Sequence, residues 1–538
     1  MTYDHISNES PRSRTMNKII KSGAAALMLS GLMSAPFSLQ AAIPGISGTS
    51  FNLEAKANFI STPDGGVSYM WMYGVVGQPV PQYPGPTLIL QEGPAGNDTV
   101  ITVTLTNNLS GEPGEMPISF TAPGLNVYCT DCPDGPAGSV APGATQTYQF
   151  IIKRPGTYTY YSDYRTDLGV AMGLTGAIVI RPDGFAHIDN PNAPVPMSGA
   201  TQKAYPSNQT VYDHEYLVFA TDLDADYHQI VRGTGEQDWE TCLNLGQTSC
   251  ASQEEKIVAL TEALRNITQT TPGGRFIEGF FPEYWFINGR AAFDNFQGNN
   301  LPWLPTQPYS GISQTHPGQT SLVRYVAGGR QVHPFHPHGD ESAIVAVDGR
   351  IAHASNTNAV TNPGGAAPNL QWREYTIDQI PGQTVDVTWN WMPKGMGFDV
   401  YGNAAADYAS VVCTPGEPDD VFQPFVDDPL CIVDAADRGV PLPTSQPPLS
   451  DLAFGGFWSG SPFLGKFGTL PPGEGGLNAN GGLAMIWHSH REKELINKDV
   501  FPGGYLSIMM VEPFEDPDGN TVTIPRGSCF DSNNGSGC

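Results

Sequence analysis

The sequence predicts an all-β protein built as sandwiches or barrels, and three observations lead to this fold class. Gly (61) and Pro (48) make up about a fifth of the 538 residues, and only 15% of the residues are charged. Short runs of strand-forming residues dominate the chain. Many turn residues between short strands are typical of sandwiches and barrels, and not of long helices or coiled coils. At about 150 residues per domain, the length indicates three to four domains.

The strand-like runs are alternating or β-branched and are bounded by Pro and Gly turns. One stretch, Ser252–Ile267, has the periodicity of a helix. A Pro/Asn/Ser-rich linker is predicted at 184–210, and a Pro/Gly-rich, acidic surface insertion at about 414–480. The clearest predicted strands are Thr87–Leu90, Val100–Leu105, Thr147–Ile152, Glu215–Ala220, Ser321–Val326 and Gln383–Trp389.

The N-terminal segment has the order of a secretory signal peptide. A basic region at Met16–Lys21 precedes an apolar stretch from Gly23 to about Phe37, and Ala41 offers a small residue for cleavage. Residues 1–41 are therefore predicted to direct export to the periplasm or the cell exterior; the alternative is a buried N-terminal helix. No later stretch offers 18 uninterrupted apolar residues, so no membrane span is expected.

The charge balance restricts the possible partners. The chain has 26 basic and 53 acidic residues, a formal net charge of −27. Nucleic acid is not expected as a partner, because its phosphates need a basic surface. Such an excess of carboxylates suits a soluble exported protein that stays dispersed by self-repulsion.

The eight cysteines fall in neighbouring pairs, which predicts local disulfides of an exported protein. For Cys129-Thr-Asp-Cys132 a zinc site is the alternative, although no second such pair or flanking histidine accompanies it. The pairs are Cys129/Cys132, Cys242/Cys250, Cys413/Cys431 and Cys529/Cys538.

Five of the eleven histidines lie in two short segments, which indicates a metal site. Side chains alternate faces along a strand, so His336 and His338 share one face, as do His488 and His490. His333 tends to the opposite face. If the two segments meet, four imidazoles surround one point, and imidazole suits copper, zinc, iron and nickel. The segments are His333-Pro-Phe-His-Pro-His-Gly339 and His488-Ser-His490.

These two segments resemble the third-domain signature and the C-terminal His-Cys-His of multicopper oxidases. Further landmarks agree in family order over roughly residues 50–515, among them Pro84–Thr87, Gly156–Tyr158 and Ile287–Arg290. The resemblance implies three Greek-key cupredoxin-like sandwiches, copper as cofactor, and metal ligation by His333, His336, His338, His488 and His490. The implied domains are 50–183, 205–312 and 313–515, the last with the insertion, followed by a tail at 516–538.

The chain also departs from the family pattern. Ser489 replaces the cysteine whose thiolate defines a blue type 1 copper, and Glu494 stands where a further histidine is usual. In the first domain, Phe120–Pro123 and Tyr161–Asp163 replace both histidine pairs. One copper is therefore expected, or two if Tyr161, Asp163 or Glu492 contributes oxygen donors, which would also admit other transition metals. Alternatively, Glu492 and Glu494 form ordinary surface pairs with Arg491 and Lys493.

Three functions remain open from the sequence. The first is a copper-dependent oxidoreductase of altered type, which would use a small-molecule reductant or a metal substrate. The second is a non-catalytic protein that binds or carries copper or another metal in the cell envelope. The third is a scaffold whose histidines are vestigial, against which the four surviving ligands argue. No catalytic residue is identified, and no phosphate loop or Gly-x-Ser-x-Gly motif is present.

Overall fold

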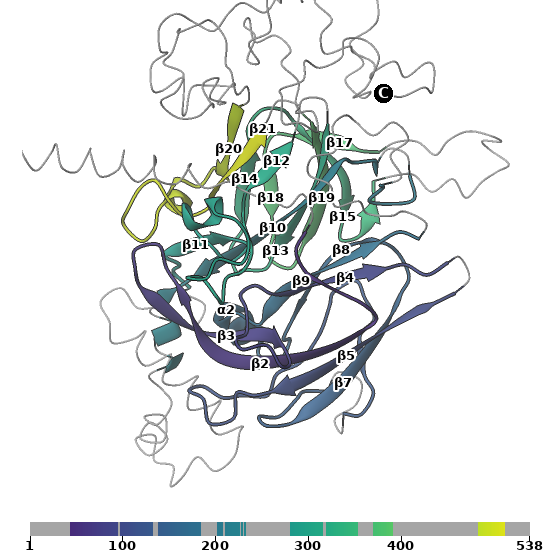
Figure 1. The fold of residues 1–538 in the computed structure, drawn as a ribbon, viewed down its shortest axis with the longest axis vertical. Coiled ribbons are helices and arrows are strands. Elements are labelled where there is room, and N and C mark those ends of the chain that lie inside the picture. Colours follow the sequence, from purple (N-terminus) through teal and green to yellow (C-terminus); the bar gives the residue numbers. More distant parts are fainter. Residues whose placement is uncertain are drawn as a thin grey trace, which may run out of the picture.

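The computed structural model describes the chain as a mostly β protein of several sheets, which confirms the predicted fold class (Figure 1). Five of the six predicted strands lie within strands of the structure, and the sixth, Gln383–Trp389, begins one residue before β19. A short helix, α2 (Thr166–Met172), was not predicted. The described residues are 43–94, 97–132, 138–183, 202–207, 210–225, 227–229, 231–232, 280–315, 319–352, 370–390 and 483–511.

The first sandwich is formed by the N-terminal part of the chain. One sheet has the order β1-β4-β9-β8 and the other the order β3-β2-β5-β7-β6, and side chains of both sheets form one core. The strands are β1 (Ile46–Ser47), β2 (Ser50–Ser61), β3 (Val67–Val75), β4 (Gly85–Gln91), β5 (Thr99–Asn107), β6 (Tyr128–Cys129), β7 (Thr145–Ile152), β8 (Gly156–Tyr161) and β9 (Thr175–Arg181).

The second sandwich also has two sheets that share one core. One has the order β11-β10-β13-β19-β15-β16, with β17 paired to β15, and the other has the order β12-β21-β20-β14-β18. Its strands are β10 (His214–Leu223), β11 (Tyr284–Ile287), β12 (Ser313–Thr315), β13 (Thr320–Ala327), β14 (His333–Pro337), β15 (Ser342–Val347), β16 (Arg350–Ile351), β17 (Trp372–Glu374), β18 (Ile377–Gln379), β19 (Thr384–Asn390), β20 (Leu483–Ser489) and β21 (Leu506–Val511).

Strand burial follows the sequence pattern. Along β5, Ile101, Val103 and Leu105 are fully buried while the threonines between them are partly exposed, as expected for a strand with one face in the core. The strand β10 is buried along its whole length. It lies between the two sandwiches, so both of its faces are covered, which suits its apolar run Tyr216–Ala220.

The described strands of the range 205–312, for which a second sandwich is predicted, are β10 and β11. β10 pairs in parallel with β13, and β11 pairs with β10, so both extend the sheet of the second sandwich. Among the described residues of this range, no sheet stands apart from that one. The sequence pattern predicts strands, but which edge a strand joins depends on long-range packing. The division of the chain into three domains stays a prediction.

The two sandwiches pack through an apolar layer and a buried charge network. Ile89 and Val179 of the first sandwich contact Leu217 and Phe219 of β10. Beside this layer, the carboxylate of Glu215 accepts hydrogen bonds from Arg181 (2.6 Å) and Arg324 (2.7 Å). The carboxylate and the two guanidinium groups are therefore buried as charged partners. Removing one of them would leave another buried charge without its counterpart.

The network continues from Arg324 to the first sandwich. Arg324 lies 3.1 Å from Asp386 of β19 and donates to Oγ1 of Thr157 on β8 at 2.9 Å. Thr157 in turn donates to Asp386 (2.6 Å), and so does the hydroxyl of Tyr205 (2.5 Å). Arg324 and Asp386 are buried, so this contact fixes the relative position of the two sandwiches.

The hairpin between β15 and β16 gives a test of this junction. Asp348 and Gly349 both have positive φ (50° and 65°), as a two-residue Asp-Gly turn requires. A Cβ on Gly349 would clash with the hydroxyl of Tyr158 in the first sandwich. We expect Gly349→Ala to lower the free energy of unfolding by about 2–4 kcal/mol, since backbone strain and overpacking add. Chemical denaturation measures this change.

Gly382 is the matched control, because its φ is +82° and nothing lies within 4 Å of its Cβ position. Gly382→Ala should cost only the backbone strain, about 1–2 kcal/mol. Equal losses in the two variants would show that contact with Tyr158 does not matter.

Several predicted features lie outside the described residues. They are the signal peptide (1–41), most of the linker (184–210), the helix Ser252–Ile267, the insertion (414–480), the tail (516–538) and the three cysteine pairs other than Cys129/Cys132. In the part of the chain that the structure describes, no helix has the length and apolar character needed to cross a membrane.

Candidate metal centre

The strands β14 and β20 bring the two histidine segments together. They pair antiparallel, with His336 directly opposite His488 and Phe335 opposite Ser489. Burial alternates along both strands, so His333, Phe335 and Ser489 face the core while His336 and His488 are half-buried on the other face. The backbone continues this order beyond the strands, because His490 N–H donates to the carbonyl of Pro334 (2.8 Å) and His338 N–H to that of Ile486 (3.2 Å).

Four imidazoles consequently form one cluster, which we call the four-His cluster: His336, His338, His488 and His490. The centroid of the His336 ring lies 4.7 Å from that of His338 and 4.3 Å from that of His490. The His488 ring lies 4.8 Å from His338 and 5.2 Å from His490. The arrangement that period-two alternation predicts is therefore present in the structure.

The environment disfavours protonation of His336, His338 and His488. Burial, and then the neighbouring imidazoles, lower the pKa of His336 to about 4 and that of His338 to about 3. Burial also lowers the pKa of His488. Protonation would place positive charges side by side in a partly desolvated site, which is why it is disfavoured. A neutral imidazole has the free lone pair that a metal ion needs.

Two nitrogens of the cluster already have the spacing of ligands to one ion. Nε2 of His338 and Nε2 of His488 lie 3.0 Å apart. Metal–imidazole bonds are about 2.0–2.1 Å long, so both atoms can reach a single ion. Nδ1 of His338 is buried and has no hydrogen-bond partner. The donor set fits copper, which imidazole ligands suit.

The other rings need to rotate before more than two nitrogens meet. No three potential ligand atoms from different residues of the four-His cluster lie within 4.8 Å of one another. In the part of the chain that the structure describes, such a group occurs at Cys129, Asp131 and Cys132. His336 Nδ1 is held by the hydroxyl of Thr376 at 3.0 Å, which fixes its ring orientation. Hydrogen bonds of this kind orient ligating histidines in metal sites.

His333 lies on the other face of β14, inside an ion triad with Asp222 and Glu494. Its Nε2 is 3.3 Å from Asp222 Oδ2, its Nδ1 is 3.1 Å from Glu494 Oε2, and all three side chains are buried. Burial alone would lower the pKa of His333, but hydrogen bonds and charges of the two carboxylates outweigh it and raise the pKa to about 9. Metal ligation by His333 stays a prediction, and it would require loss of this proton.

The sequence analysis did not find Asp222. It stands at the end of β10, and its carboxylate accepts hydrogen bonds from the backbone of Arg330 (3.1 Å) and Gln331 (2.7 Å). These bonds fix the turn that leads into His333. The sequence did contain a signal for Asp222, because this residue stands near the end of the mostly apolar strand Leu217–Leu223. A carboxylate buried there needs a charged or hydrogen-bonding partner.

The carboxylates after His490 separate into two environments. Glu494 is buried and lies 2.9 Å from Arg491, in addition to its contact with His333. Glu492 and Asp499 are exposed. The predicted ion pair between Glu494 and Arg491 is therefore present, but the Glu494 carboxylate is buried, whereas a surface pair was expected. Ser489 is fully buried, and its hydroxyl accepts a hydrogen bond from Arg491 N–H (3.1 Å).

The two first-domain segments that lack histidines also meet in the structure. Thr121 and Tyr161 pair as an isolated bridge, and the hydroxyl of Ser119 donates to Asp163 while accepting from its backbone N–H (2.9 Å). The rings of Phe120 and Tyr160 stack at 5.1 Å. Tyr161 lines a cavity of about 270 Å³ that Arg330 also lines. Metal ligation by Tyr161 or Asp163 stays a prediction.

The remaining described candidates have other partners. His214 Nε2 lies 2.6 Å from Oε1 of Gln319, and His228 Nδ1 lies 2.5 Å from the carbonyl oxygen of Tyr69, so both are packed, hydrogen-bonded histidines. Cys129 and Cys132 form the predicted disulfide. In this oxidised form the two sulfurs are not available as zinc ligands.

Known proteins share parts of this sequence. Residues 63–184 match the family described as multicopper oxidase. The chain is 33% identical over 162 residues to laccase-1 of Emericella nidulans, covering 28% of this chain and 23% of that protein. It is 34% identical over 103 residues to L-ascorbate oxidase of Brassica rapa subsp. pekinensis, covering 18% and 16%. The matched stretches thus span less than a quarter of these relatives.

Solved structures are similar over longer stretches at lower identity. The blue copper oxidase from Nitrosomonas europaea is 14% identical with a TM-score of 0.42, over 86% of this chain and 85% of that one. The copper nitrite reductase from the same organism is 14% identical with a TM-score of 0.34, over 64% and 84%.

Proposed function

We propose that this protein, whose residues 63–184 match the multicopper oxidase family, is an exported, copper-dependent oxidoreductase of multicopper-oxidase type with an incomplete copper set. Copper would be held by the four-His cluster. The observation that supports this most directly is the cross-strand register of His336 and His488, which gathers four imidazoles on one face. Export rests on the predicted signal peptide.

Each histidine has a distinct part in this proposal. His338 and His488 would be the first ligands, because their Nε2 atoms are already 3.0 Å apart. His336, oriented by Thr376, and the exposed His490 would complete the site. Trp487 holds the segment after β14 in place by donating its Nε1–H to the carbonyl of His338 (3.0 Å). Bound copper would supply one-electron or oxygen chemistry with a small-molecule reductant or a metal substrate.

The ion triad supports an altered reaction and not the usual laccase mechanism. His333 would be a ligand of a type 1 copper in the family pattern, but both of its ring nitrogens face carboxylates. Ser489 offers a hydroxyl where a thiolate would be needed. We therefore propose that the protein has no type 1 copper and that electrons enter the four-His cluster directly.

A second candidate is a copper-binding or carrier protein without turnover. The same ion triad favours it, because loss of the usual electron-entry site affects catalysis and not binding. Catalytic metal sites keep an open coordination position, whereas sites that only bind the metal close all of them. Exposed His490 distinguishes the two candidates. If its ring binds the metal, the fourth coordination position is closed, as in a binding protein; if it does not, that position stays open, as in a catalytic site.

Metal content and copper spectroscopy on the purified chain test the proposal. After equilibration with copper and removal of loosely held ions, we expect about one copper per chain, a type 2-like resonance and no intense blue absorption. An intense blue band would mean that a type 1 site exists. Absence of tightly bound copper would refute the proposal. Dioxygen consumption with a phenolic or metal reductant then distinguishes an oxidase from a binding protein.

A further inference from the structure

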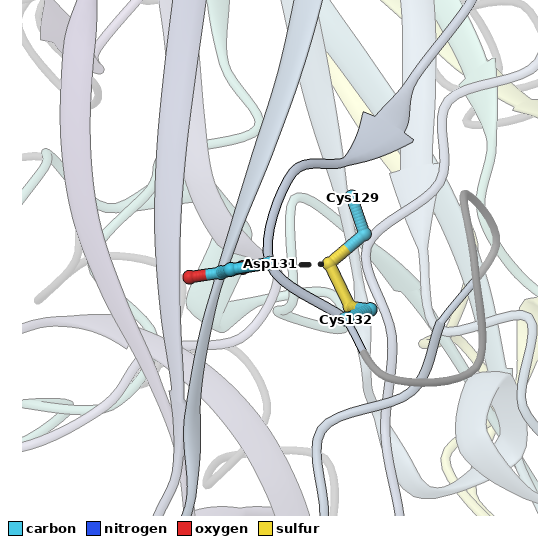
Figure 2. A group of neighbouring side chains, drawn as sticks. All are labelled: Cys129, Asp131 and Cys132. Atoms are coloured by element: carbon cyan, nitrogen blue, oxygen red, sulfur yellow. Dashed lines mark hydrogen bonds between the residues drawn. A yellow bond between two sulfur atoms is a disulfide. The ribbon is translucent and has the colours of Figure 1, made fainter.

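We propose that Cys129, Asp131 and Cys132 form a second metal site that exists only when the disulfide is reduced, and that it binds one thiophilic cation. Figure 2 shows Cys129, the last residue of β6, joined to Cys132 by the disulfide, with a dashed contact between Asp131 and a sulfur. Their ligand atoms all lie within 4.8 Å of one another. The Asp131 carboxylate oxygen is 3.7 Å from Sγ of Cys129. This site does not depend on the proposed function of the four-His cluster.

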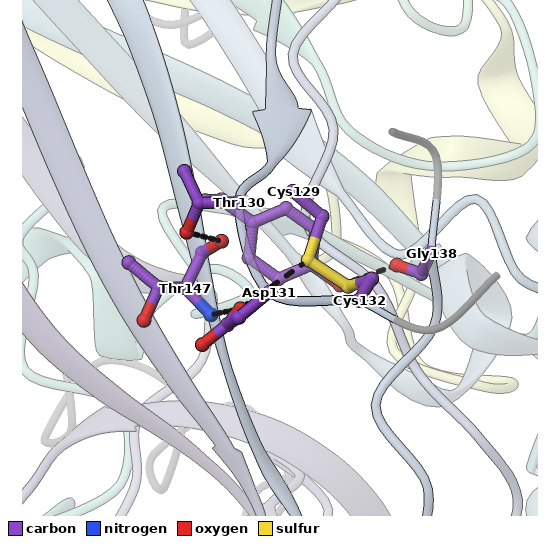
Figure 3. Close-up of a disulfide and its surroundings, with 7 residues drawn as sticks. Cys129, Thr130, Asp131, Cys132, Gly138 and Thr147 are labelled. Atoms are coloured by element: carbon purple, nitrogen blue, oxygen red, sulfur yellow. Dashed lines mark hydrogen bonds between the residues drawn. A yellow bond between two sulfur atoms is a disulfide. The ribbon is translucent and has the colours of Figure 1, made fainter. Parts of the chain in front are cut away.

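The turn is held in place by contacts other than the disulfide (Figure 3). The N–H of Thr130 donates to the carbonyl of Thr147 (2.9 Å), and the N–H of Thr147 donates to Asp131 Oδ1 (2.8 Å). Cys129 is itself paired with Tyr148 of β7. Breaking the sulfur–sulfur bond therefore leaves Cys129 and Asp131 anchored beside β7, with Cys132 one residue beyond Asp131.

The disulfide contributes little as a structural crosslink. Its cysteines are three residues apart in the sequence, and closing such a short loop constrains the unfolded chain least. The hydrogen bonds to Thr147 already fix the turn. A redox and metal-binding role explains the pair better than stabilisation does.

Exposure permits the disulfide to be reduced from solution. Asp131 is exposed and Cys132 is half-buried, while Cys129 is buried. A thiolate of an external dithiol would attack Sγ of Cys132, forming a mixed disulfide and releasing Cys129 as thiolate. The second thiol of the reductant then forms its own disulfide and releases Cys132. Two electrons and two protons pass to the protein pair, and the dithiol is oxidised.

The ligand set selects the kind of ion. Thiolates prefer soft or borderline ions such as Cu(I), Zn²⁺ and Cd²⁺, and the carboxylate adds a third negative ligand. On binding, the two thiols lose their protons to solvent, so the ion replaces two protons between three anionic groups. A solvent molecule can occupy the remaining position, since Asp131 lies at the surface.

A cadmium titration of the full chain tests the site. The protein is reduced with a phosphine, which contains no thiol, the reductant is removed without air, and Cd²⁺ is added. We expect the reduced wild type to bind one more Cd²⁺ than the equally reduced Cys129→Ser/Cys132→Ser variant, with additional thiolate-to-cadmium absorption in the ultraviolet. The four-His cluster and the other six cysteines are present in both proteins, so their contributions cancel, and the result stands whether or not that cluster binds copper.

Variants assign the extra ion to this turn. Cys129→Ser/Cys132→Ser keeps the other six cysteines and should lose the extra ion. Asp131→Asn removes a proposed direct ligand and should weaken binding by more than the roughly 10–100-fold that the loss of an outer-shell partner costs. Thr130→Val, in the same turn but without a ligand atom, should leave the affinity unchanged.

Two results would overturn the proposal. One is equal cadmium binding by the reduced wild type and the double serine variant, with unchanged thermal unfolding in both. The other is an unchanged affinity in Asp131→Asn, which would remove the carboxylate from the site.

Discussion

Changing His336 and His488 together to alanine is expected to abolish tight copper binding while the protein stays folded. The two residues are opposite each other on paired strands and supply half of the four-His cluster. Both are only half-buried, so truncation removes little core packing. The measurement is copper per chain after dialysis, which should fall from about one to none, together with thermal unfolding of the apo protein.

Two control variants make this result specific. His333→Gln should keep its copper, because His333 is in the ion triad on the other face of β14. His214→Asn should also keep it, since this histidine is hydrogen-bonded to Gln319. Retention of about one copper in the double variant would contradict the four-His site. If the double variant unfolds, the exposed His490 can be changed alone, and an unchanged copper affinity would then count against the site.

Asp222→Ala is expected to have the largest effect on stability, about 3–5 kcal/mol, because it leaves a buried charge without one of its partners. Asp222 lies 3.3 Å from His333 and also accepts hydrogen bonds from the turn before β14. Chemical denaturation near neutral pH measures the loss. Glu492→Ala, an exposed carboxylate of the same region, should stay within about 0.5 kcal/mol of wild type.

The pH dependence of stability provides an independent readout of the same triad. The pKa of His333 is about 9 in the folded protein, raised from the 6.5 of an ordinary histidine. Since the folded pKa is raised, the stabilisation is complete below pH 6.5 and is lost as the pH rises to 9 and above. The shift corresponds to about 3 kcal/mol. This alkaline loss should shrink in Asp222→Ala and be absent in His333→Gln; its persistence in His333→Gln would assign it to another group.

The sequence was sufficient to predict the local structure of the candidate site. Period-two alternation placed His336 and His338 on one face of a strand and His333 on the other, and the structure has this arrangement. The strands themselves were also predictable, because β-branched alternation and Pro/Gly turns are local signals. The all-β class follows from them.

Contacts between distant segments could not be predicted in the same way. Asp222 and His333 are separated by more than a hundred residues, and only the parallel pairing of β10 with β13 brings them together. That pairing also places β10 and β11 in the second sandwich. Hydrophobic patterning indicates that β10 is buried, but it does not identify the neighbouring strand.

The buried contact among Arg324, Glu215, Asp386 and Thr157 has a consequence for dissecting the molecule. Neither sandwich would be a stable fragment by itself, because each would expose one side of the apolar layer and leave ionic groups without their counterparts. Genetic truncation at the boundary should yield insoluble halves. The two sandwiches should melt in a single calorimetric transition, and copper chemistry at β14 and β20 should therefore be studied in the intact polypeptide.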